Sequence, residues 1–196
     1  MISSTNNTKN IYNKSISKVV EIRVSNDNIN FYFGTGCFIS KNIILTNKHV
    51  IEDELKVTYN TIQYRKYNEE NFQDIISLKK KYLDIDLYEI EVNNNEDYFK
   101  IRTINIGSKC YAIGNSSGNG LTFLEGVISN KTIIILEDST TQMIASSVSL
   151  TRGMSGGALI DNNGYLVGIL TLRLRDTDNT PIYAISYSID LSFYSH

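Results

Sequence analysis

Apolar and polar residues alternate in many short runs along most of this chain, and glycine, asparagine or serine residues separate the runs. Alternation with a period of two residues is typical of strands that bury one face, and many short strands at regular spacing favour an all-β fold built of barrels. The predicted strands are 19–24, 31–39, 42–45, 55–59, 61–67, 75–78, 85–92, 109–113, 121–129, 132–136, 143–147, 158–160, 165–174 and 182–187.

Two polar stretches divide this pattern. Residues 1–14 are polar and rich in asparagine, so we expect a flexible N-terminus there. A second polar stretch, with three asparagines at 93–95, starts a natural link between two groups of strands. We therefore expect an N-terminal barrel over 15–95 and a C-terminal barrel over 96–196.

One serine lies in a glycine-rich turn that leads directly into an apolar strand. Gly153, Gly156 and Gly157 surround Ser155, and glycines let the backbone turn sharply and approach a substrate closely. A serine hydroxyl becomes a nucleophile when a base lies beside it and when backbone N–H groups stabilise the oxyanion that it creates. Ser155 is thus a candidate nucleophile, and the N–H groups of Gly153 and Ser155 are candidate donors of an oxyanion hole.

A base and an acid precede this serine. The chain has two histidines, and one of them, His49, ends a strongly apolar run. Two aspartates, Asp84 and Asp86, lie in the predicted strand 85–92 or next to it, and we expect their side chains to share one strand face. We favour Asp86 as the acid and keep Asp84 as the alternative. The order His, Asp, Ser is the one used by chymotrypsin-type enzymes.

Six segments in this order resemble the trypsin-like serine proteases, and most closely the bacterial HtrA/Deg-type protease domain. They are residues 34–40, 44–50, 107–115, 124–129, 153–157 and 164–171. The segment around His49 is also similar to that of staphylococcal glutamyl endopeptidases. The resemblance implies two six-stranded antiparallel β-barrels with the active site in the cleft between them. It also implies a serine endopeptidase that works through an acyl-enzyme and acts on a protein or peptide substrate.

The resemblance places substrate-binding positions on both sides of Ser155. The base of the primary pocket would be Ser149, followed by Leu150 and Thr151, and the walls would include Ile169, Leu170 and Thr171. No acidic residue occupies these positions, so the implied preference is a small or medium apolar residue before the cleaved bond.

Met154 departs from the family, which usually has Asp or Asn before the nucleophile. Methionine cannot pair with a newly cut N-terminal amine, so packing or an activating protein partner would have to hold the oxyanion hole. A catalytically inactive binding module on the same fold therefore remains the alternative function, and an acyl-transferring esterase is also open.

Composition excludes several other classes. The net charge of −2 gives no field that would attract nucleic acid. No apolar run is long enough to span a bilayer, and neither a metal-ligand set nor a cofactor motif is present. Cys37 and Cys110 both fall in apolar strands, and we expect them to be reduced core residues, with a disulfide between them as the less favoured alternative. With no signal-like N-terminus, we expect a cytoplasmic protein, or a secreted one if an export signal has been removed.

Overall fold

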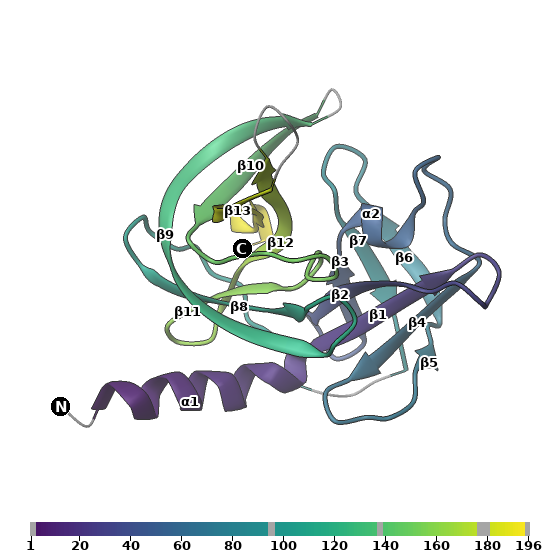
Figure 1. Ribbon diagram of the computed structural model, residues 1–196, viewed down its shortest axis with the longest axis horizontal. Coiled ribbons are helices and arrows are strands. Elements are labelled where there is room, and N and C mark those ends of the chain that lie inside the picture. Colours follow the sequence, from purple (N-terminus) through teal and green to yellow (C-terminus); the bar gives the residue numbers. More distant parts are fainter. Residues whose placement is uncertain (1–2, 94–96, 137–138, 176–180, 195–196) are drawn as a thin grey trace.

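The computed structural model describes residues 3–93, 97–136, 139–175 and 181–194, and the chain forms two β-rich halves in succession (Figure 1). The first half begins with two N-terminal helices and contains α1 (Ser3–Ser15), η1 (Ile16–Lys18), β1 (Val19–Ser25), β2 (Tyr32–Phe38), β3 (Ile43–Thr46), α2 (Lys48–Ile51), β4 (Thr61–Lys66), β5 (Gln73–Asp74), β6 (Ser77–Lys81) and β7 (Tyr88–Glu91). The second half contains β8 (Lys109–Asn115), β9 (Leu121–Leu136), β10 (Ser139–Ser146), β11 (Ala158–Asp161), β12 (Leu166–Arg175), β13 (Pro181–Asp190) and η2 (Ser192–Tyr194). The predicted all-β class is therefore confirmed, with short helices added.

The second half is a closed barrel of six antiparallel strands in the order β10-β13-β12-β11-β8-β9. Its strand β9 is long enough to pair with β8 through its first part and with β10 through its second part. The two strands predicted at 121–129 and 132–136 are thus one strand. The barrel agrees with the closed six-stranded architecture that the sequence predicts for this half.

The first half differs from the prediction, because it is an open sheet of seven strands in the order β5-β4-β1-β2-β3-β7-β6. Its two edge strands, β5 and β6, are consecutive in the chain, so the sheet curls until only Ile75 and Ile76 separate its ends. Ile75 N–H donates to the Ile62 carbonyl on β4, and Ile76 N–H donates to the Glu91 carbonyl on β7. Strand β5 has only two residues, which pair with β4, and no pairing joins β5 to β6 among the described residues, so the prediction of a second closed six-stranded barrel is wrong.

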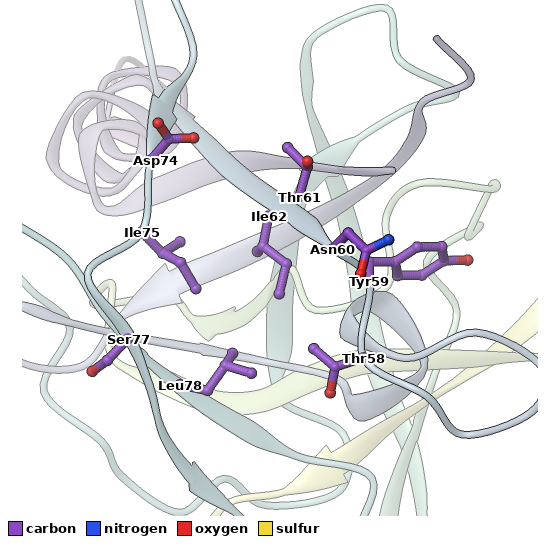
Figure 2. A pocket seen from close by; sticks show the side chains of 9 residues that line it. All are labelled: Thr58, Tyr59, Asn60, Thr61, Ile62, Asp74, Ile75, Ser77 and Leu78. Carbon is purple, nitrogen blue, oxygen red and sulfur yellow. The ribbon is translucent and has the colours of Figure 1, made fainter. Parts of the chain in front are cut away.

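A hollow of about 420 Å³ lies where this sheet stays open. It is lined by residues 58–62 and by Asp74, Ile75, Ser77 and Leu78, with the side chains of Ile62, Ile75 and Leu78 around it (Figure 2). None of the residues predicted to form the site lines this hollow, so we treat it as a consequence of the open sheet.

Three hydrophobic clusters stabilise the fold. One fills the curled sheet around Val20, Ile22 and Phe38, and another fills the closed barrel around Ile128 and Val167. The third lies between the halves, because it combines buried residues of both. Its members include Val19, Cys37, Leu45, Leu87, Tyr111, Ile113, Ala158 and Ile169. Burying apolar area contributes about 25 cal/mol per Å², so this shared cluster fixes the two halves against each other.

The N-terminal stretch that we expected to be flexible forms helix α1, which extends from the body of the molecule (Figure 1). Its sequence is polar, but Ile11 is buried, and Ile11, Tyr12 and Ile16 belong to or pack on the cluster between the halves. Tertiary contact at the C-terminal end of the helix therefore outweighs a composition that favours disorder. The predicted limits between the two halves stay predictions.

Both cysteines are free and buried, as we expected. Burial raises the pKa of both thiols, that of Cys110 to about 12, so neither is a reactive thiolate near neutral pH. No helix in the described ranges combines the length and apolar character needed to cross a lipid bilayer. Within the same ranges, no three His, Cys, Asp or Glu side chains are grouped so that they would hold a metal ion.

Candidate active site

His49 and Asp86 form a close pair at one end of the first half. His49 lies on α2, directly after β3, while Asp86 lies in the loop between β6 and β7. The His49 Nδ1 and Asp86 Oδ2 atoms are 2.6 Å apart, and the His49 backbone N–H donates to Asp86 Oδ1 at 3.1 Å. One carboxylate therefore holds both the ring and the backbone of this histidine. A ring held through Nδ1 keeps Nε2 available as a base.

Asp84, the alternative acid, is exposed, and the structure pairs Asp86 with His49 instead. The pairing strand β7 begins only at Tyr88, so both aspartates lie in the preceding loop rather than on one strand face. Side chains alternate between two faces only along a strand, so the expectation that Asp84 and Asp86 share one face does not apply in this loop.

Asn47, in the segment 44–50 that carries the resemblance, supports the loop of Asp86, although it was not among the predicted site residues. Its buried side chain donates to the Asp86 carbonyl at 2.9 Å and to Thr171 Oγ1 at 3.1 Å. Thr171 Oγ1 in turn donates to the Ile169 carbonyl. The backbone of Asp86 is thereby tied to β12 in the second half.

Two tyrosines also hold the loop between β6 and β7 that carries Asp86. Tyr82 N–H donates to the Leu87 carbonyl, and the hydroxyls of Tyr82 and Tyr194 are hydrogen-bonded to each other and to Glu89. Burial raises the pKa of both tyrosines, so their hydroxyls stay protonated and keep donating at neutral pH. The C-terminal η2 segment is thus anchored to the hairpin that carries Asp86.

Ser155 lies in the turn before β11, in the second half. Its hydroxyl donates a long hydrogen bond of 3.5 Å to the Thr171 carbonyl. Ser155 and His49 are both described, and no hydrogen bond joins them. Catalytic hydrogen bonds are often long or misaligned before substrate binds.

The turn around Ser155 has the conformation that its glycines permit. Gly153 and Gly156 have φ values of +86° and +85°, in the left-handed region. A Cβ on Gly156 would lie 2.0 Å from the Thr35 carbonyl oxygen, so only glycine fits there. In the described part of the chain, the N–H groups of Gly153 and Ser155 have no hydrogen-bond acceptor. Both predicted donors of the oxyanion hole are therefore free.

Thr35, on β2 of the first half, holds this turn in place. Its N–H donates to the Ser155 carbonyl at 2.9 Å, and its hydroxyl donates to the Gly153 carbonyl at 2.7 Å. The hydroxyl also accepts from Asn115 N–H at 2.8 Å, and the Thr35 carbonyl accepts from Thr46 Oγ1. Thr35 was not among the predicted site residues, and its one signal in the sequence is a polar side chain between two glycines in an apolar strand.

Met154 fills the position where the family usually has an acidic or amide side chain. It is 1% exposed and belongs to the apolar cluster of the closed barrel. The turn therefore gains apolar packing from this side chain.

The residues predicted to bind substrate fall into two groups. Leu150, Ile169 and Leu170 are buried, and each belongs to a hydrophobic cluster. Ser149 is exposed and Thr151 is half-buried, while Thr171 is buried but presents its carbonyl to Ser155. The structure thus places the apolar side chains of this set in the core, and the specificity of the site stays a prediction.

The comparison with protein families decides the classification. The family described as the trypsin-like peptidase domain matches residues 34–169, a range that contains His49, Asp86 and Ser155. This chain belongs to that family. The resemblance that the sequence motifs indicated is therefore confirmed.

Relatives of this peptidase domain are HtrA-type proteases. It is 30% identical over 195 residues to the serine endoprotease DegS of Haemophilus influenzae, covering 93% of this chain and 53% of DegS. It is 32% identical over 149 residues to the periplasmic pH-dependent serine endoprotease DegQ of Escherichia coli, covering 72% of this chain and 31% of DegQ. The peptidase domain thus spans about half of one relative and a third of the other.

Solved structures show the same fold. The HtrA-type protease AlgW with a tripeptide has a TM-score of 0.81 at 22% identity, covering 95% of this chain and 60% of that one. The serine endoprotease from Yersinia pestis has a TM-score of 0.77 at 26% identity, covering 100% and 65%.

The expected cytoplasmic location is wrong, because relatives, DegQ among them, are named as periplasmic proteins. The N-terminal sequence was not a guide to the compartment. The two free cysteines were no guide either, since thiols that are buried and protonated resist oxidation in any compartment.

Proposed function

We propose that this peptidase domain is a serine endopeptidase, with Ser155 as nucleophile, His49 as general base and Asp86 as the acid that orients it. The observation that carries the proposal is the 2.6 Å contact between His49 Nδ1 and Asp86 Oδ2, with the His49 backbone N–H on the other carboxylate oxygen. This double contact fixes the ring so that Nε2 is the nitrogen left to accept a proton.

In the proposed reaction, Ser155 Oγ attacks the substrate carbonyl carbon while His49 Nε2 takes the hydroxyl proton. The carbonyl oxygen becomes an oxyanion, which the free N–H groups of Gly153 and Ser155 stabilise. The C–N bond then breaks, the amine leaves with the proton from His49, and an acyl-enzyme remains. Water hydrolyses this ester by the same proton transfers in reverse order.

The proposed substrate is a protein or peptide cut after a small or medium apolar residue. The absence of an acidic side chain among Ser149, Leu150 and Thr151 supports this preference, as does the fact that relatives are named serine endoproteases. By the same relatives, we place the protein in the cell envelope. Thr35 holds the turn around Ser155 from within the chain, and an activating protein partner stays a prediction.

A second candidate is an inactive binding module on the same fold. It is favoured by one observation, the hydrogen bond from the Ser155 hydroxyl to the Thr171 carbonyl instead of to His49. The two candidates differ in whether the folded protein cleaves peptide bonds.

Incubation of the wild-type protein with unfolded casein, followed by mass spectrometry of the fragments, tests the proposal. We expect cuts mainly after alanine, valine and similar residues, and none with Ser155→Ala prepared in the same way. Cuts that persist in Ser155→Ala, or no cuts by folded wild type, would overturn the proposed function, and the second outcome would favour the binding module.

Replacing Thr35 by valine is expected to lower kcat as well as stability. Valine keeps the shape but leaves the half-buried Gly153 carbonyl and the buried Asn115 N–H without their partner. An unpaired buried group costs about 1–3 kcal/mol, and the turn that carries the oxyanion donors loses one anchor.

Thr46→Val is the matched control, because Thr46 Oγ1 also donates inside this network, but only to the Thr35 carbonyl. Urea unfolding and peptide turnover, measured on both variants, should show a loss of stability in both, larger for Thr35→Val, and a larger loss of kcat per folded molecule for Thr35→Val. Equal kcat in the two variants would show that Thr35 acts on stability alone.

A further inference from the structure

A partly buried ion pair lies close to the proposed base and acid. Lys81 Nζ and Glu52 Oε1 are 2.6 Å apart, and the Glu52 side chain is only 9% exposed. Glu52 directly follows α2, and its N–H caps that helix by donating to the Lys48 carbonyl at 2.8 Å. Lys81 is the last residue of β6, directly before the loop that carries Asp86. The pair therefore connects the helix that carries His49 with the strand that leads to Asp86.

Helix α2 crosses the end of one strand of the first sheet. The strand order is β3-β7-β6 at this edge, with Thr46 opposite Tyr88 and Tyr88 opposite Lys81. The helix begins two residues after Thr46 on β3, and Glu52 at its other end reaches Lys81 on β6. It therefore spans β7, the strand that follows the loop of Asp86, and Figure 1 shows α2 beside β6 and β7.

The ion pair attaches α2 on the β6 side, while on the β3 side the chain itself holds the helix. A carboxylate that is nine-tenths buried needs a cation beside it, because an unpaired buried charge is strongly destabilising. Glu52 and Lys81 thus have few favourable arrangements other than the one observed. His49 lies between the two attachments, so both of them determine how its Nδ1 meets Asp86 Oδ2 at 2.6 Å.

We propose that Lys81 and Glu52 are positioning residues, and that their ion pair keeps His49 aligned with Asp86. The inference rests on the proposed function and deepens it. Among the described residues, no hydrogen bond or ion pair joins either side chain to His49. The pair therefore acts through the placement of α2, and its role differs from that of a group that touches the substrate.

Lys81→Met tests this role, because methionine keeps an unbranched side chain and removes the charge. Misplacement of a catalytic group by about 1 Å can cost about 100-fold in rate. Since Asp86 remains beside His49, we expect kcat to fall less than that, about 5- to 20-fold, with KM within about twofold of wild type. Lys79→Met is the matched control, because it removes the same charge from an exposed side chain two residues earlier on β6. It should keep the kcat of wild type.

Two measurements separate positioning from a merely structural role. The NMR signals of the His49 ring nitrogens report the contact with Asp86, and they should move or broaden in Lys81→Met but not in Lys79→Met. Lys81→Arg keeps a cation for Glu52 and should hold kcat within about threefold of wild type. A merely structural pair would lower the midpoint of urea unfolding in Lys81→Met and leave kcat per folded molecule and the His49 signals unchanged. That result would overturn the inference.

If Lys81→Met does not fold, Glu52→Gln takes its place, because it removes the buried charge and leaves no unpaired carboxylate. We expect a loss of kcat of about 3- to 10-fold at constant KM, and an unchanged kcat would overturn the inference.

Failure of the proposed function would look different, because folded wild type and Lys79→Met would then both fail to turn over substrate. The NMR comparison would still decide the inference in that case. His49 signals that differ between Lys81→Met and Lys79→Met would support the placement of His49 by the ion pair, and identical signals would overturn it.

Discussion

Replacing Ser155 by alanine is expected to lower kcat about 10⁶-fold, the loss that follows removal of the nucleophile from a serine protease triad. In the proposed mechanism the attack on the carbonyl carbon needs the Oγ atom of Ser155, and alanine has no atom that can replace it. The free energy of unfolding should change little, because this hydroxyl makes only one long bond, 3.5 Å, to the Thr171 carbonyl.

Peptide turnover and urea unfolding of Ser155→Ala, with Ser40→Ala as a control at the turn between β2 and β3, would measure both effects. The control should behave like wild type in both assays. A Ser155→Ala protein that retains a hundredth or more of wild-type activity would mean that another group is the nucleophile.

Replacing Asp86 by asparagine is expected to lower kcat/KM about 10⁴-fold, the loss seen when a triad aspartate becomes asparagine. The amide nitrogen of the new side chain would point an N–H at His49 Nδ1, where Asp86 Oδ2 now lies at 2.6 Å. The ring would then carry its proton on Nε2, which is the nitrogen that must accept the proton of Ser155.

Asp84→Asn is the matched control, because it removes the same charge from a side chain that is exposed and lies two residues before Asp86. We expect its kcat/KM to remain within about twofold of wild type, because exposed charges contribute little. A loss in Asp84→Asn as large as in Asp86→Asn would contradict the assignment of the acid.

The parts of the site that lie within short segments could be predicted from the sequence. Ser155 between its glycines and His49 after an apolar strand are local patterns, and the order of six such segments indicated the family. The choice between Asp84 and Asp86 was harder, because it depends on how the loop before Tyr88 folds. A rule based on strand alternation gives no answer in a loop.

The contacts between distant segments could not be predicted in the same way. The apolar run predicts that β2 is a strand, but not that Thr35 on this strand meets the turn around Ser155, about 120 residues later. The bond from Ser117 to the Arg152 carbonyl is a backbone contact between two loops, and it leaves no mark in the residue types. The open first sheet depends likewise on how its edge strands β5 and β6 lie in space.

The N-terminal helix could not be predicted either, because a contact with distant residues stabilises it. Its polar composition favours disorder, and the burial of Ile11 against the cluster between the halves is a tertiary effect. Neither the polar N-terminus nor the buried thiols indicate the location of the protein, because both features are compatible with the cytoplasm and with the periplasm.

Labelling with a fluorophosphonate probe tests the central claim most directly, because the probe reacts with a serine only when a base and an oxyanion hole are assembled around it. Wild type, His49→Ala and Ser155→Ala would be treated in parallel, and the modified peptide would be identified by mass spectrometry. We expect labelling of wild type at Ser155 and none in either variant. Folded wild type that stays unlabelled, or that is labelled at another residue, would contradict the account.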